Sequence, residues 1–201
     1  MFSKLTRTAK AFFKKEDGLV SVEFALYVPM LLFAFAATVT YFDAFRQENS
    51  NLKAAYTVSD LISRETNYVN ETYIDSMHKL TELMIRSDSE ISVRISVVRW
   101  DEEDARHYVD WSKVRGSSYI EWTDATVEAI QDSLPTMPDQ ERVIVVETNN
   151  ELTPLFNVGL PTMNIQNLVF TRPRFAPQVV FVDTAPNDKS HKDNAMKVVT
   201  N

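Results

Sequence analysis

The sequence contains no cysteine and only three glycines among its 201 residues. Without cysteine, the chain can form neither a disulfide nor a thiolate metal site, so an extracytoplasmic domain would be held together by its core alone. The glycines are Gly18, Gly116 and Gly159. Gly18 lies where a charged leader meets an apolar run, and inside a helix it would cost about 1 kcal/mol relative to alanine.

The chain also lacks the motifs of common catalytic sites, including G-x-S-x-G, H-E-x-x-H and a glycine-rich phosphate loop. Its histidines lie far apart, without a second ligand at metal spacing: His78, His107 and His191. The four consecutive acids at 101–104 lack the spaced oxygens of a calcium loop, and we predict a solvated hairpin tip there. We assign the three tryptophans to the core or a sheet face: Trp100, Trp111 and Trp122. We therefore predict a protein that is not an enzyme and that holds no cofactor or metal ion.

Charge is absent from one long stretch near the amino terminus. From Phe24 to Phe42 there is no charged residue for 19 positions. A helix of that length is about 28 Å long, close to the thickness of the hydrocarbon core of a bilayer. The pattern predicts a transmembrane helix over 19–42. Pro29 lies inside it and removes a backbone hydrogen bond, which predicts a helix kink that membrane helices tolerate.

The charges on the two sides of this stretch have opposite balance. Residues 1–18 carry five basic and two acidic side chains, whereas the chain beyond Glu23 carries 16 basic and 25 acidic ones. Because positive residues flanking a membrane helix stay in the cytoplasm, we expect the amino terminus inside and the acidic domain outside, in the periplasm of a bacterium. An acidic domain does not attract nucleic acid, so we exclude that class of partner.

Helical periodicity continues beyond the apolar stretch. Apolar and small residues recur at three- and four-residue steps, and they predict one helix from about Leu19 to about Glu65: Phe45, Leu52, Ala55, Tyr56, Ser59 and Ile62. A polar break is expected at 66–70, where Asn70 can cap a second helix. The predicted buried stripe of that helix is Tyr73, Met77, Leu80 and Met84.

The following residues alternate as β-strands do. Ile91 to Val97 predicts a half-buried strand, and His107 to Arg115 predicts its antiparallel hairpin partner. A short helix is expected at 123–134, with Thr123 as its cap and Pro135 beyond its end. An apolar central strand is expected at 142–148, a loop at 153–161, and closing strands at 166–172 and 178–183. The predicted fold is therefore α+β: residues 43–183 form one domain whose antiparallel sheet packs on the helix continuation at 43–65, and 184–201 form a disordered tail.

Glu23 is the residue whose chemistry stands out. A carboxylate within a membrane segment is costly and by default indicates function. If the peptide bond after Gly18 were cut, Leu19 would acquire a cationic α-amino group that cannot lie in lipid alone. Glu23, the fifth residue of the shortened chain, could neutralise that amine on a neighbouring subunit. The alternative is a glutamate near the interface that reaches the lipid headgroups.

The segment GLVSVEF at 18–24, followed by ALYVPMLLFAFA, resembles the amino terminus of the TadE-like pseudopilins of tight-adherence (Flp) pili, with its G-x-x-x-x-E-[FY] pattern and early proline. The resemblance continues in RVIVVETNNELTPLF at 142–156 and in TRPRF at 171–175. It implies a minor pilin-like subunit of the inner membrane, cut between Gly18 and Leu19 by a prepilin peptidase. Glu23 and Phe24 would form the motif for processing and assembly. The implied partners are other pilins or pseudopilins and the pilus assembly machinery, and the implied role is assembly or anchoring of pili for surface attachment.

Two other classes of protein remain open at this point. A Sec-secreted soluble binding protein could be cut at the A-x-A site Ala34-Phe35-Ala36. An uncleaved single-pass membrane protein could bind a periplasmic partner through its domain. The mass of the mature protein would distinguish all three.

Overall fold

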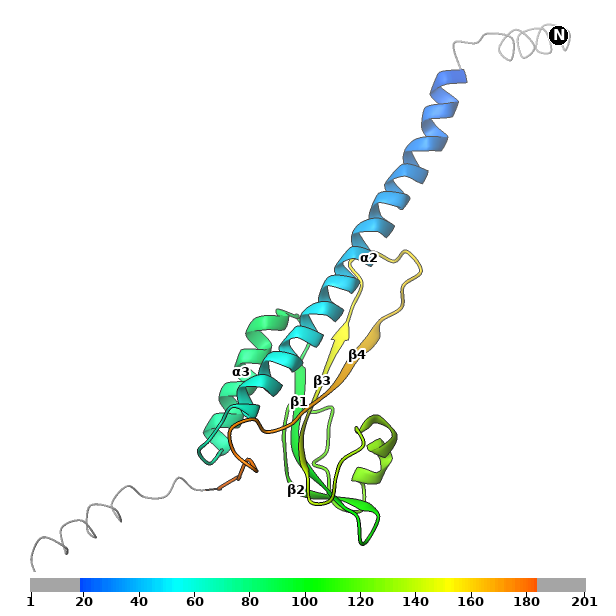
Figure 1. The fold of residues 1–201 in the computed structure, drawn as a ribbon. Helices are drawn as coiled ribbons and strands as arrows, with labels where there is room; N and C mark the ends of the chain where they lie inside the picture. The colour runs from blue at the N-terminus through cyan, green and yellow to red at the C-terminus, as the bar shows by residue number, and fades with distance from the viewer. Residues whose placement is uncertain (1–18, 184–201) are drawn as a thin grey trace, which may run out of the picture. The chain divides into compact units, whose positions relative to one another are not determined.

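The computed structural model describes residues 19–183 (Figure 1). The predicted leader, including Gly18, and the predicted tail at 184–201 lie outside the described residues. The first described element is helix α2, Leu19–Ser63, which runs for 45 residues without a break. Its bounds confirm the single long helix expected from the sequence. No glycine lies between its ends, and its one proline, Pro29, is near the start, so the backbone can stay helical throughout.

A short connection separates α2 from helix α3, Glu71–Ile85. Asn70 caps α3 as expected, because its side-chain oxygen accepts a hydrogen bond of 2.9 Å from the amide of Tyr73. The predicted stripe was displaced by one position. The buried side chains are Ile74, Met77, Thr81 and Ile85, so only Met77 was predicted correctly, while Tyr73, Leu80 and Met84 are partly buried. The Thr81 hydroxyl is tolerated there because it donates to the Met77 carbonyl within the helix.

Four antiparallel strands form one sheet in the order β2-β1-β3-β4. The strands are β1 (Ile91–Asp101), β2 (Arg106–Arg115), β3 (Arg142–Leu152) and β4 (Met163–Thr171). The hairpin of β1 and β2 and the central place of β3 confirm the expectation from the alternating and apolar segments. The expectation that β1 is half-buried was wrong, because every side chain from Ile91 to Val98 is buried and both faces of the strand are covered.

The two faces of the sheet carry separate cores. On one face, α2 and α3 cover the sheet; α2 contributes Ala54, Ala55, Val58 and Ile62 (Figure 1). On the other face, the 3-10 helix η2, Val127–Ser133, covers Val98, Val143 and Val145. Two members of the predicted stripe of α2 do not join the core, since Phe45 is 63% exposed and Tyr56 is 58% exposed.

Two further expectations require correction. The helix expected at 123–134 is a 3-10 helix that begins only at Val127, and its N-cap is Thr126 rather than Thr123. The segment at 178–183 is not a strand of the sheet. Its backbone bonds to Val69, with the Val69 amide donating to Val180 and the Val182 amide donating to Val69, which leaves a single parallel bridge.

The chain divides into two compact units. Among the described residues, one comprises α2 through Arg46 together with Thr153–Thr162, the loop between β3 and β4. The other comprises Gln47–Leu152 and the described residues from Met163 onward, and it contains the sheet, α3 and the second half of α2.

Candidate functional site

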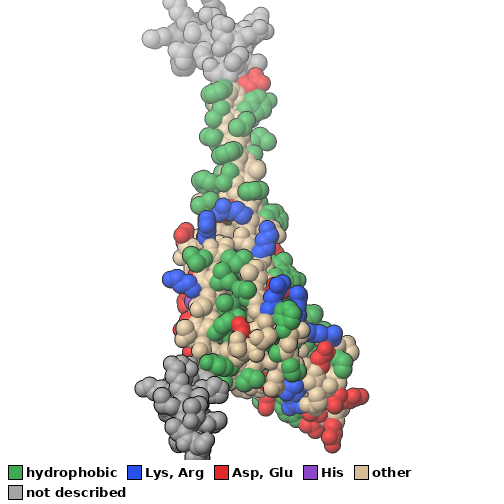
Figure 2. All heavy atoms as spheres, turned by 60° about the vertical axis from the view of Figure 1, so that its left-hand side comes forward, with side chains coloured by type: hydrophobic (Ala, Val, Ile, Leu, Met, Phe, Trp, Pro, Cys, Tyr) green, Lys and Arg blue, Asp and Glu red, His purple; other side chains and the backbone are tan. Residues whose placement is uncertain are grey.

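The first half of α2 exposes a continuous apolar surface. Nine large hydrophobic side chains between Val22 and Phe35 are each 56–69% exposed: Val22, Phe24, Leu26, Tyr27, Met30, Leu31, Leu32, Phe33 and Phe35. Figure 2 shows hydrophobic side chains over this part of the helix. A water-soluble surface rarely gathers so much apolar area, which instead marks contact with lipid or protein. The helix is long and apolar enough to cross a membrane.

Glu23 lies within this apolar surface, one turn from the start of α2. Its side chain is exposed, and it forms no ion pair with another described residue. Phe24, next to it, is 68% exposed. The partner that the sequence argument requires, an amine on Leu19 of a neighbouring subunit, belongs to another molecule. The structure therefore presents a carboxylate on an apolar helix surface, accessible to a partner from outside the chain.

Two other sequence features lie inside the same helix. Pro29 occupies an uninterrupted stretch of α2, where it leaves the carbonyl of Ala25 without its usual amide donor, and the kink stays a prediction. Ala34 and Ala36, which would precede a signal-peptidase cut, also lie in continuous helix, so no break in the helix marks a cleavage site there.

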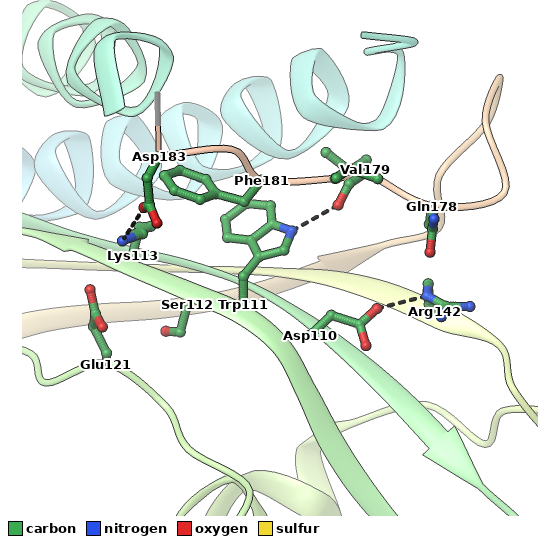
Figure 3. A pocket seen from close by; sticks show the side chains of 11 residues that line it. Asp110, Trp111, Ser112, Lys113, Glu121, Arg142, Gln178, Val179, Phe181 and Asp183 are labelled. Atoms are coloured by element: carbon green, nitrogen blue, oxygen red, sulfur yellow. Dashed lines mark hydrogen bonds and ion pairs between the residues drawn. The ribbon is translucent and has the colours of Figure 1, made fainter. Parts of the chain in front are cut away.

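The domain has an open pocket of about 560 Å³ beside β2 (Figure 3). The indole of Trp111 forms its centre and donates a hydrogen bond of 2.7 Å to the Val179 carbonyl, which ties the segment at 178–183 across the sheet. Phe181 packs on the same indole, with ring centroids 5.5 Å apart. A bulge in the β1–β2 register between Val97 and Val98 leaves Asp110 unpaired with β1.

Each basic side chain that lines this pocket has an acidic side chain beside it. Arg142 donates to Asp110 at 2.7 Å, and Lys113 lies 2.9 Å from Glu71 and 3.6 Å from Asp183. The hydrogen bond with Glu71 raises the pKa of Lys113, and hydrogen bonds from Arg115 and then Lys113 lower the pKa of Glu71. Both groups therefore stay charged near neutral pH, whereas a general acid or base needs a pKa close to the working pH.

A second polar cluster is buried on the other face of the sheet. Arg94 of β1 donates two hydrogen bonds of 2.6 Å to Glu147 of β3, and both side chains are at most 9% exposed. The guanidinium lies 3.8 Å from the Trp122 ring and 4.5 Å from the Tyr119 ring, and it donates to the Ile120 carbonyl at 2.7 Å. Burial, followed by the charge of Glu147, raises the pKa of Tyr119 to about 12. The cluster is fully paired and fastens the loop after β2 onto the sheet.

The two described histidines contact different partners. His78 contacts the Ile91 carbonyl at 2.8 Å, and His107 lies against Trp100 with ring centroids 4.7 Å apart. His191 lies outside the described residues. Within 19–183, no three His, Asp or Glu side chains gather in a way that could hold a metal ion. Asp101 ends β1 and accepts a hydrogen bond from the amide of Asp104 in the hairpin turn that follows.

Sequence reasoning missed the Arg94–Glu147 pair. Arg94 lies in a strand that was predicted to be half-buried, where it alternates with apolar neighbours, and Glu147 follows an apolar run within the strand predicted at 142–148. The useful signal was the aromatic loop SSYIEW at 117–122, which supplies two rings to cover a cation.

Comparisons of the chain with protein-family models, with curated proteins and with solved structures find no match.

Proposed function

We propose that this protein is a TadE-like minor pilin, or pseudopilin, of a tight-adherence (Flp) pilus system. In this proposal, a prepilin peptidase removes residues 1–18 at the cytoplasmic face of the inner membrane. The shortened chain then takes part in assembling or anchoring pili through contacts with other pilins and the assembly machinery. Its domain lies in the periplasm, in keeping with the basic leader and the acidic domain.

The observation that supports this proposal best is the single helix α2. Its first half exposes apolar side chains, and its second half supplies Ala54, Ala55, Val58 and Ile62 to the core of an α+β domain. One continuous helix thus joins an apolar, membrane-length segment to a folded domain. A cleavable secretion signal has no need to continue into the core of the protein it exports, so the continuity favours the pilin proposal over secretion.

Glu23 is the residue that would make this helix an assembly element. After cleavage, the amine of Leu19 on one subunit would require a counter-charge in an apolar setting, and the carboxylate of Glu23 on the next subunit, which pairs with no residue in 19–183 of its own chain, would supply it. Removing one partner of a buried pair costs about 3–5 kcal/mol. A cost of that size lowers association by at least about a hundredfold.

The test is Glu23→Ala, compared with Glu48→Ala, which removes an exposed glutamate from the same helix beyond the apolar stretch. We expect Glu23→Ala to insert and to be shortened normally, because losing a charge makes the segment more apolar. Recovery with other pilins and display of pili should fall sharply, whereas Glu48→Ala should behave as wild type. Glu23→Asp should be intermediate. Wild-type piliation by a processed, stable Glu23→Ala protein would show that Glu23 is only an interfacial residue.

A further inference from the structure

The loop between β3 and β4 belongs to a second long uncharged stretch. Residues 152–171 contain no Asp, Glu, Lys, Arg or His for 20 positions, about as long as the uncharged stretch of α2. In the whole chain, by contrast, 24% of residues are charged. β4 accounts for part of this stretch, but Thr153–Thr162 lies outside the sheet, where polar and charged side chains are normally abundant.

This loop groups with the apolar half of α2 rather than with the sheet. Thr153–Thr162 and the helix through Arg46 form one compact unit (Figure 1). Thr40 is only 2% exposed, whereas the neighbouring Tyr41 and Phe42 are 43% and 72% exposed. The loop is the other described part of this unit, and we assign the cover over Thr40 to it.

The loop directs large apolar side chains outward. Leu155 is 65% exposed and Phe156 is 48% exposed, whereas Val158 and Leu160 are half-buried. Gly159 has φ +92°, and no atom lies within 4 Å of the place where its side chain would be, so the loop turns in open space. Outward Leu and Phe on a loop without charges are unfavourable in water and suit an apolar medium.

The position of Thr40 along α2 sets the depth at which the loop lies. Asp43 is the first charged residue after the apolar stretch. If Glu23 and Asp43 lie near the two opposite surfaces of the bilayer, the helix between them spans about 30 Å, which is the thickness of the hydrocarbon core. Thr40 is then less than one turn from the outer boundary. A loop that covers Thr40 lies where the acyl chains meet the headgroups.

We propose that the loop Thr153–Thr162 is a second membrane contact, which places Leu155 and Phe156 in the headgroup–acyl boundary of the bilayer crossed by α2. The proposal rests on the membrane crossing contained in the proposed function and not on the pilin role. Since the loop has no basic residue, the contact is hydrophobic and does not select anionic lipids. It would hold the unit formed by helix and loop at a fixed depth, which a single helix that can slide and tilt does not do.

Absence of cysteine makes the test direct, because one introduced cysteine carries the only label. The full chain with Phe156→Cys, labelled with an environment-sensitive fluorophore, is placed in nanodiscs at one chain per disc. Leu83→Cys, at a 63% exposed leucine of α3, is the matched control. Phe42→Cys, at a 72% exposed residue of the apolar stretch, reports whether α2 crosses the bilayer. Thermal unfolding identical to wild type confirms that each labelled chain is folded.

We expect the label at 156 to emit at shorter wavelength and to be quenched several-fold more by nitroxide lipids than the label at 83. The result should be the same in zwitterionic and in anionic discs. A lipid-quenched label at 42 with a water-exposed label at 156 would overturn the loop proposal alone. Water-exposed labels at both positions would overturn the membrane crossing too. Protection at 156 that appears only with several chains per disc would identify a subunit interface and overturn the lipid contact.

Discussion

Neutralising Glu147 should destabilise the domain strongly, because its partner Arg94 would remain buried without a counter-charge. The substitution Glu147→Gln keeps the size and shape of the side chain and removes only the charge. In the wild type, Arg94 donates two hydrogen bonds of 2.6 Å to this carboxylate, and Trp122 donates a third from its indole at 2.7 Å. The carboxylate is thus the acceptor for three donors in a site that is at most 9% exposed.

The size of the effect follows from what remains around Arg94. Breaking a buried ion pair by removing one partner costs about 3–5 kcal/mol. The Ile120 carbonyl and the rings of Trp122 and Tyr119 still contact the guanidinium, and a desolvated cation–π contact stabilises by about 2 kcal/mol. Because these contacts to the guanidinium are retained in Glu147→Gln, they keep the loss of stability small within that range but do not abolish it. We expect a loss of about 3 kcal/mol from a domain whose total stability is typically about 5–15 kcal/mol.

The assay is urea unfolding of the full chain in detergent micelles, followed by tryptophan fluorescence at constant pH. The double variant Arg94→Met with Glu147→Leu removes both charges, and it should recover most of the loss because apolar pairs often replace buried ion pairs at little cost. Arg64→Met, which breaks an exposed pair with Asp60, is the control and should cost less than about 1 kcal/mol. A Glu147→Gln loss no larger than the Arg64→Met loss, or a double variant as unstable as the single one, would refute the reasoning.

Two further predictions concern single residues of the domain. In the same assay, Gly116→Ala should destabilise the domain by about 1–3 kcal/mol more than Gly159→Ala. Both glycines have positive φ, but only at Gly116 would the new Cβ collide with backbone, because it would lie 2.7 Å from Ser92 Cα. Equal losses of stability would contradict the collision. Burial lowers the pKa of His107 below its ordinary 6.5, so the unfolded chain takes up the proton first and stability falls as pH drops below 6.5. His107→Phe, which keeps a ring against Trp100, should therefore lose less stability between pH 7 and pH 5 than wild type, and an identical pH dependence would contradict this assignment.

Local patterns in the sequence predicted the two α-helices and the hairpin well. The helix α2 was predictable because a long segment free of glycine carries helical periodicity on both sides of Phe42. The cap at Asn70 was predictable because capping depends on one side chain and the next few amides. These features depend on neighbours in the chain, which a reading of the sequence contains.

The errors arose where distant segments meet. The second face of β1 is buried by the loop after β2 and by Glu147, which is 53 residues from Arg94 in the chain. The strand-like alternation at 178–183 was misleading because this segment bonds to Val69 and to the indole of Trp111 instead of a sheet edge. Such choices depend on which surface is left uncovered after the rest has folded, and periodicity does not report that.

The candidate site shows the same division. The position of Glu23 in an apolar helix was evident from the sequence, and the structure adds that no described residue of the chain pairs with it. The grouping of the loop Thr153–Thr162 with the apolar half of α2 was not predictable, since about 110 residues separate Thr40 from the loop.

The amino-terminal residue of the protein recovered from membranes tests the central claim most directly. We predict Leu19 as the first residue of the wild-type protein. Gly18→Val should keep the leader, because bulk at this position would block a peptidase that recognises a residue without a side chain. Ala36→Leu, which removes the A-x-A site, should leave processing unchanged. A wild-type chain that begins at Met1 or at Ala37, or one that is shortened normally with Gly18→Val, would contradict the account.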